Sequence, residues 1–231
     1  MNVNLIPLKI KERLNKLDSN DYDHFHCWQY VEAFNKAQLE WVRRQLHGGN
    51  IYKEGDESTK RRIDDLQILL ERQFLDKKDV TKEKIEFGTL PTDYMEYKRL
   101  DVKAKADCGI EKMNSKLVEE ANVNEYLRDW TLRPSFEWRE TFHTMRGNHF
   151  YVYTDTTFEI ENVELTYYRK PLDISLTGCE TITGEDNGDI NPEFKDDIVE
   201  LLIDEAVSIL ASDIESPNQI ISSSNRVNKN N

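Results

Sequence analysis

The sequence is short of the features that mark a membrane, secreted or disulfide-rich protein. Its longest apolar runs are a few residues, far below the roughly 20 that a membrane-spanning helix needs. Residues 1–17 contain lysines but no continuous apolar segment and no small-residue cleavage site, so no signal peptide is predicted. The three cysteines, Cys27, Cys108 and Cys179, are odd in number and far apart. This pattern predicts reduced thiols and assembly in a cytoplasm, without a disulfide framework.

Recognisable catalytic and metal-binding motifs are also missing. No serine lies in a nucleophile elbow, and no glycine-rich loop follows a predicted strand to hold phosphate. His24, His26 and Cys27 lie at the start of a predicted helix, where three such close side chains cannot point to one ion. His143 and His149 bracket a predicted turn across which they are expected to face each other, but two imidazoles alone bind metals weakly. We therefore expect no enzyme activity, no cofactor and no metal site.

One acidic loop, residues 185–191, looks a little like a calcium loop. It lacks the alternating acids and the bidentate glutamate that an EF-hand requires. We interpret it as a solvated turn before a helix, with the binding of an incidental cation as the open alternative.

Positive charge is scarce relative to negative charge. The chain has 31 Lys and Arg residues against 44 Asp and Glu residues, which gives a net charge of −13. A basic groove for nucleic acid is not expected, because counterion release needs clustered Lys and Arg. A surface that repels phosphate still suits a conduit through which DNA only passes. The alternative is that the charge serves solubility alone.

The residues that are present predict an α+β protein. At 231 residues, with 38% apolar and 10% aromatic side chains, the chain is long enough to bury a real core. We expect one domain over residues 1–231 with two lobes, one helical and one an antiparallel β-meander. The helical lobe is predicted over residues 1–80, 110–130 and 191–212, the β lobe over 82–108 and 135–172, and a C-terminal tail over 213–231.

Apolar residues at helical spacing predict the helices. They cover Ile6 to Leu17, Tyr22 to Leu46, a segment that starts near Ser58, Ile110 to Trp130, and Asn191 to Ala211. The buried stripe of the third is expected to be Ile63, Leu66, Leu70 and Phe74. The last is expected to have Asn191 as its N-cap and Pro192 at its first helical position.

Alternating apolar residues predict the strands. Leu90 to Tyr94 is expected to be a turn, after which Leu100, Val102, Ala104 and Ala106 alternate with charged residues. Arg146-Gly147-Asn148 predicts a hairpin turn, and the next strand, Thr157 to Tyr168, is expected to contain a bulge near Asn162. Six aromatic residues could form a binding platform, although aromatic residues on strands are more often core: Trp130, Trp138, Tyr151, Tyr153, Tyr167 and Tyr168.

Several stretches together carry a resemblance to a known family. They are the aromatic helix from Trp28 to Gln38, the turn Leu90 to Tyr94, and the strand end Tyr167 to Pro171, followed by the helix Asn191 to Ala211 and a polar tail. In this order they resemble the ring or adaptor (connector) proteins at the head-to-tail junction of tailed phages, especially crAss-like phages.

The resemblance implies a structural virion protein that forms a closed ring of about twelve copies beneath the portal. Its partners would be other copies of itself, the portal protein and neighbouring tail or ring proteins. DNA would pass through the bore without sequence-specific binding, and no membrane would be involved. Assembly would take place in the bacterial host cytoplasm. The alternatives are an intracellular protein-binding adaptor domain and a metal-dependent hydrolase or nuclease.

Candidate contact residues follow from apolar surface that the ring would bury. The candidates for subunit or portal contacts are Trp28, Phe34, Trp41, Ile214, Ile220, Ile221 and Arg226. The candidates for channel-facing acids are Asp64, Asp65, Asp196 and Asp197. Residues 213–231 lose the helical period and are expected to dock on a neighbouring ring or portal subunit, or else to pack back on their own subunit.

Overall fold

The computed structural model describes residues 1–15, 25–47, 64–81, 83–179 and 188–213, together with residues 221 and 225. The chain divides into two compact units. The helical unit contains residues 1–68 and 171–231, and the sheet unit contains residues 69–170. The α+β class predicted from the sequence is confirmed.

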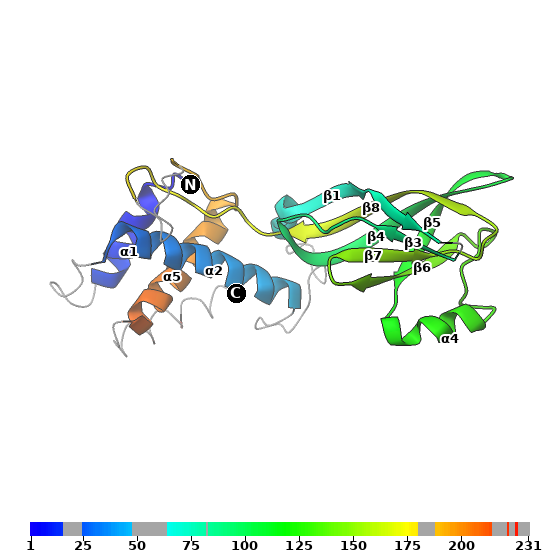
Figure 1. Cartoon of the computed structure of the whole chain (residues 1–231). Helices are drawn as coiled ribbons and strands as arrows, with labels where there is room; N and C mark the ends of the chain where they lie inside the picture. Colours follow the sequence, from blue (N-terminus) through cyan, green and yellow to red (C-terminus); the bar gives the residue numbers. More distant parts are fainter. Residues whose placement is uncertain are drawn as a thin grey trace. The chain divides into compact units, whose positions relative to one another are not determined.

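The helical unit is built from the two ends of the chain. Helices α1 (Leu5–Asn15), α2 (Cys27–His47) and α5 (Asp196–Asp213) pack together (Figure 1). On α1 the residues Ile6, Ile10 and Leu14 are buried, as their four-residue spacing predicts. The predicted helices over Ile6 to Leu17 and Tyr22 to Leu46 are therefore confirmed as α1 and α2, except that Phe25 and His26 precede α2 and that residues 16, 17 and 22–24 lie outside the described residues.

The last helix begins later than its sequence predicts. It starts at Asp196, so Asn191 is not its N-cap. The Asn191 side-chain oxygen instead accepts a hydrogen bond from the backbone N–H of Val3, at 2.8 Å. This long-range contact is not visible from local sequence. The acids Asp196 and Asp197 still occupy the first turn, where the helix dipole favours negative charge.

The predicted third helix is wrong over its second half. Residues 64–66 are helical, but a short 3₁₀ turn η2 (Gln67–Leu69) follows and strand β1 (Leu70–Leu75) begins directly after it. Leu66 is buried, whereas Phe74 is 67% exposed. Residues 58–63 of this prediction lie outside the described residues.

The sheet unit contains eight strands in one sheet, in the order β1-β8-β4-β5-β6-β7-β3-β2. The pair β5–β6 is parallel and the other neighbouring pairs are antiparallel. The remaining strands are β2 (Lys77–Val80), β3 (Lys84–Phe87), β4 (Tyr94–Ala106), β5 (Gly109–Leu117), β6 (Glu140–Arg146), β7 (His149–Tyr153) and β8 (Glu159–Arg169).

The sheet is curled. Strands β1 and β2 lie at its opposite edges, yet only Asp76 separates them in the chain. The Gly88 N–H, just after β3, donates a hydrogen bond to the Asp76 carbonyl at 2.7 Å. The two edges must therefore approach each other at Asp76. The enclosed face forms a core that includes Phe87, Leu100, Val102, Ala104, Met113, Phe150, Val152, Ile160, Val163 and Leu165.

Local features of the strands agree with the sequence. The turn before β4 and the β6–β7 hairpin are confirmed, and Gly147 has the positive φ of 58° that favours glycine. A register shift leaves Glu161 unpaired between β8 and β4, next to the predicted position of the bulge. The neighbours differ from the expected meander, because β8 pairs with β1 and β4 rather than with β7.

The helix predicted over 110–130 is wrong in its first part. Strand β5 occupies that part, and its Met113 and Ser115 are buried while Lys112, Asn114 and Lys116 are exposed. A short 3₁₀ turn η3 (Glu120–Asn122) and helix α4 (Val123–Arg128) follow. The spacing of Met113 and Leu117 fits a helix as well as a strand, and pairing with β4 and β6 decides the outcome.

Candidate functional site

Two tryptophans of the sheet unit are the most exposed large apolar side chains in the described part of the chain. Trp130 is 76% exposed and Trp138 is 75% exposed. Both lie in the connection between α4 and β6. Exposed tryptophan is costly in water, and large aromatic side chains dominate the energetics of binding surfaces. We therefore take this connection as the first candidate site.

A hydrogen-bonded turn fixes the position of Trp130. The Asp129 carboxylate accepts from the backbone N–H of Thr131 at 2.8 Å and from its hydroxyl at 2.7 Å. These two hydrogen bonds lower the pKa of Asp129. The Arg133 N–H donates to the Asp129 carbonyl at 3.0 Å. Trp130 is thus displayed on a closed turn rather than on a loose loop.

A second closed turn fixes Trp138. Ser135 and Glu140 exchange two backbone hydrogen bonds, at 2.9 and 3.2 Å. Between them Arg139 has a φ of 55°, a left-handed conformation that non-glycine residues rarely adopt. Phe136 anchors the turn against Phe158, with ring centroids 6.0 Å apart. The indole of Trp138 is left in solvent.

The two turns enclose a hollow of about 270 Å³. We call it the tryptophan hollow, and its lining residues are Trp130, Thr131, Arg133, Ser135, Trp138 and Glu140. The Glu140 carboxylate lies 3.4 Å from the Lys116 ammonium. Aromatic faces, two hydroxyls and one charge of each sign therefore surround one small space.

The six aromatic residues proposed as a platform separate into two classes. Tyr153, Tyr167 and Tyr168 are buried, as expected for strand aromatics, and Tyr151 is half-buried. The two tryptophans lie outside the strands, among polar residues and beside Pro134. Their position in the sequence, outside the predicted strands, was the feature that could have distinguished these two residues from the core aromatics.

The predicted contact residues are only partly at the surface. Phe34 is 0% exposed and Trp41 is 4% exposed, and the Trp41 ring packs edge-on against Phe194 with centroids 5.2 Å apart. Both are core residues of the helical unit, so their prediction as contacts is corrected. Trp28 is 38% and Ile221 is 61% exposed. Ile214, Ile220 and Arg226 lie outside the described residues.

Three of the four predicted channel acids lie beside a positively charged group of the same chain. Lys195 binds Asp64 and lies 3.4 Å from Asp65, and the hydrogen bond to Asp64 raises the pKa of Lys195. The Asp196 carboxylate pairs with the N-terminal ammonium. Asp197 is exposed. Asp197 is therefore the best of the four for testing an effect of surface charge.

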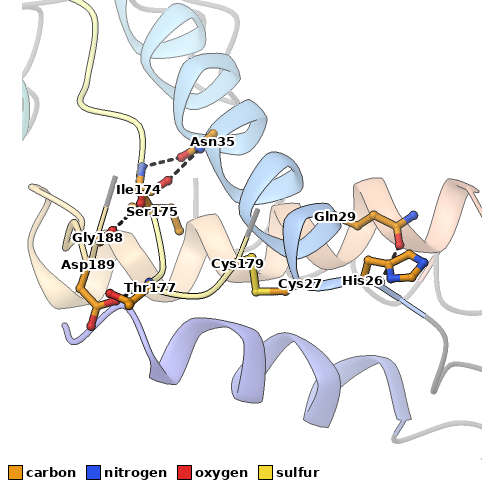
Figure 2. Close-up of a disulfide and its surroundings, with 10 residues drawn as sticks. All are labelled: His26, Cys27, Gln29, Asn35, Ile174, Ser175, Thr177, Cys179, Gly188 and Asp189. Atoms are coloured by element: carbon orange, nitrogen blue, oxygen red, sulfur yellow. Dashed lines mark hydrogen bonds between the residues drawn. A yellow bond between two sulfur atoms is a disulfide. The ribbon is translucent and has the colours of Figure 1, made fainter. Parts of the chain in front are cut away.

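A disulfide joins Cys27 to Cys179, which corrects the prediction of reduced thiols (Figure 2). Cys27 is the first residue of α2, and Cys179 lies 152 residues later, after the return from the sheet unit. Only the fold brings residues so distant in sequence together. Cys108, at the turn between β4 and β5, is free and exposed.

The disulfide ends a segment, residues 171–179, that lies along the helical unit, and we call it the strap. The Asn35 side chain on α2 donates to the Ile174 carbonyl at 3.2 Å and accepts from the Ile174 N–H at 2.8 Å (Figure 2). The Thr177 N–H donates to the Asp189 carboxylate at 2.7 Å, which lowers the pKa of Asp189. Asp189 is thus bound to the protein, whereas residues 185–187 of the acidic loop lie outside the described residues.

The two histidines of the predicted hairpin do not face each other. His143 pairs with Val152 and is fully buried, whereas His149 pairs with Arg146 and is half-buried. The His143 Nδ1 lies 2.7 Å from the Ser115 hydroxyl, and burial lowers the pKa of His143 to about 3. Among the described residues, no group of three or more His, Cys, Asp or Glu side chains is arranged to hold a metal ion.

Within the same described ranges, no helix has the length and apolar character needed to cross a membrane. No protein-family model and no curated protein matches the chain.

Proposed function

We propose that this chain is a structural adaptor that assembles as a ring between the portal and the tail of a phage, with its bore open to DNA. The proposal rests on the resemblance in the order of elements and on an exposed apolar patch of the sheet unit. Catalysis has no part in it.

The observation that supports the proposal best is the exposed apolar patch of the sheet unit. Phe74 on β1 is 67% exposed and Ile110 on β5 is 49% exposed. Both line a hollow of about 270 Å³ on the sheet unit, together with Asp101, Val102, Lys103, Glu111, Lys112, Asn162 and Glu164. An apolar centre with a charged rim is the usual composition of a protein–protein interface. A ring needs such a surface on each subunit, because each copy must bind the next.

The test is assembly in the presence of the portal protein. We expect the purified chain to form closed rings on portal particles, counted by native mass spectrometry and seen by electron microscopy. The variants Phe74→Ser and Ile110→Ser should remain folded but lose ring formation, because the interface loses its apolar centre. Val80→Ser is a matched control, since Val80 is 63% exposed on the edge strand β2 and does not line the patch.

A chain that stays monomeric with the portal present contradicts the proposal. Rings that form equally well with both patch variants would show that another surface joins the subunits. For the bore, Asp197→Lys is the cleanest charge reversal, and slower DNA passage in assembled particles is the expected result.

A further inference from the structure

The tryptophan hollow presents two indole rings without partners. In the described part of the chain, neither the Trp130 nor the Trp138 ring stacks against another aromatic ring or lies under a Lys or Arg cation. Both tryptophans stand on turns that backbone hydrogen bonds close, so the backbone loses little conformational freedom when a ligand stacks on the rings. The structure therefore offers two exposed aromatic faces to a molecule from outside.

Polar groups lie between these faces. The hollow is also lined by Arg133, Glu140 and the hydroxyls of Thr131 and Ser135. A purely apolar partner would bury the two charges without giving them hydrogen bonds, which is unfavourable. The ligand must therefore combine flat apolar faces with a rim of donors and acceptors. A sugar ring has this combination, since its C–H bonds form a face and its hydroxyls form the rim.

We propose that the tryptophan hollow binds a carbohydrate, with hexose rings stacked on Trp130 and Trp138. In this arrangement the Glu140 carboxylate accepts hydrogen bonds from sugar hydroxyls, and the Arg133 guanidinium donates to ring or hydroxyl oxygens. A hollow of about 270 Å³ is large enough for one or two sugar rings. This binding goes beyond the adaptor role and does not depend on it.

The site is one for binding rather than for cleavage. Hydrolysis of a glycosidic bond ordinarily uses two carboxyl groups placed on either side of the bond. Among the described residues that line the hollow, Glu140 is the only one with a carboxylate, and it lies beside Lys116. The site would consequently release the sugar without cleaving it.

The experiment titrates the full-length chain with soluble tetrasaccharides of glucose, galactose, mannose and N-acetylglucosamine. Saturation-transfer NMR identifies which one binds, and calorimetry gives its Kd. We expect Trp130→Ala and Trp138→Ala each to weaken binding by at least about tenfold. Trp138→Phe should have an intermediate effect, because it keeps a smaller aromatic face. Trp28→Ala is the control, since Trp28 is a partly exposed tryptophan on α2 in the helical unit.

Three results would overturn the proposal. The first is that none of the four tetrasaccharides binds the wild-type chain. The second is that a sugar binds with the same Kd after both tryptophan substitutions. The third is that a proline-rich peptide, which also stacks on aromatic grooves, binds in a Trp138-dependent way while the sugars do not. Unchanged thermal unfolding of the variants separates loss of binding from loss of fold.

Discussion

The buried histidine of the sheet unit makes the stability of the protein depend on pH. His143 has a pKa of about 3 in the folded protein because burial disfavours its charged form, whereas an ordinary histidine titrates near 6.5. The unfolded chain therefore binds an additional proton between these two values. The free energy of unfolding must fall as the pH is lowered through this range, and it is unaffected by His143 above it.

We predict that His143→Gln removes this part of the pH dependence. Between pH 6.5 and 4.5 the wild-type chain should lose about 2–3 kcal/mol more than the variant, since each pH unit corresponds to about 1.4 kcal/mol. Denaturant titrations at the two pH values measure the difference. His149→Gln is the control, because His149 is on the same hairpin and only half-buried. Parallel pH profiles for wild type and His143→Gln would contradict the assigned protonation state.

Single residues also show what the sequence could not reveal. The helical spacing of Phe34 and Trp41 correctly placed them on one face of α2, but spacing alone does not say whether that face meets another subunit or the same chain. Here the face meets the same chain, because the ring of Phe194, just before α5, packs against Trp41. The exposure of Trp130 and Trp138 likewise depends on turns that close through backbone hydrogen bonds.

At the scale of elements, the strap attaches the segment that follows the sheet unit to helix α2 by a disulfide and by hydrogen bonds. It is fixed to α2 by Asn35 and by the disulfide, whose Cys27 end is exposed. Its other anchors are buried apolar side chains, Ile174 and Leu176. The disulfide therefore strengthens an attachment that noncovalent contacts already hold.

We predict that Cys27→Ser lowers the free energy of unfolding of the helical unit by about 2–4 kcal/mol, because the unfolded chain regains the freedom of a long loop. Loss of helical circular dichroism during denaturation measures the effect, and a reducing agent should give the same shift in the wild-type chain. Cys108→Ser should change nothing, as Cys108 is free. Equal stability with and without reductant would mean that the disulfide contributes nothing to the helical unit.

Helices and strands could be predicted from the sequence where the local spacing of apolar residues determines them. Helices α1 and α2, the strand β4, the β6–β7 hairpin and the bulge in β8 all follow from periodicity and turn residues. The apolar spacing predicts helices where strands β1 and β5 lie, because apolar residues four apart satisfy both periods. The order of the sheet was not predictable, since it depends on pairings between strands far apart in the chain.

The whole molecule consists of a helical unit that is interrupted by a sheet unit with its own core. We predict that residues 69–170, expressed alone, fold into the same curled sheet. A cooperative thermal transition and dispersed NMR amide signals would demonstrate this, and a variant with Phe87→Ala should lose about 3–5 kcal/mol as a core control. A fragment without a cooperative transition would show that the sheet unit needs the helices to fold.

The antiparallel pairing of β1 with β8 places Leu70 opposite Tyr168, so the chain enters and leaves the sheet unit side by side. The disulfide joins Cys27 to Cys179, so the covalent loop that it closes contains the whole sheet unit. Tension applied to the chain outside these two cysteines would pass through the disulfide and leave the β1–β8 pair without load. Fully extended, residues 69–170 would span roughly 340 Å. Reduction of the disulfide would therefore be needed before a pulling force could draw out this length of chain.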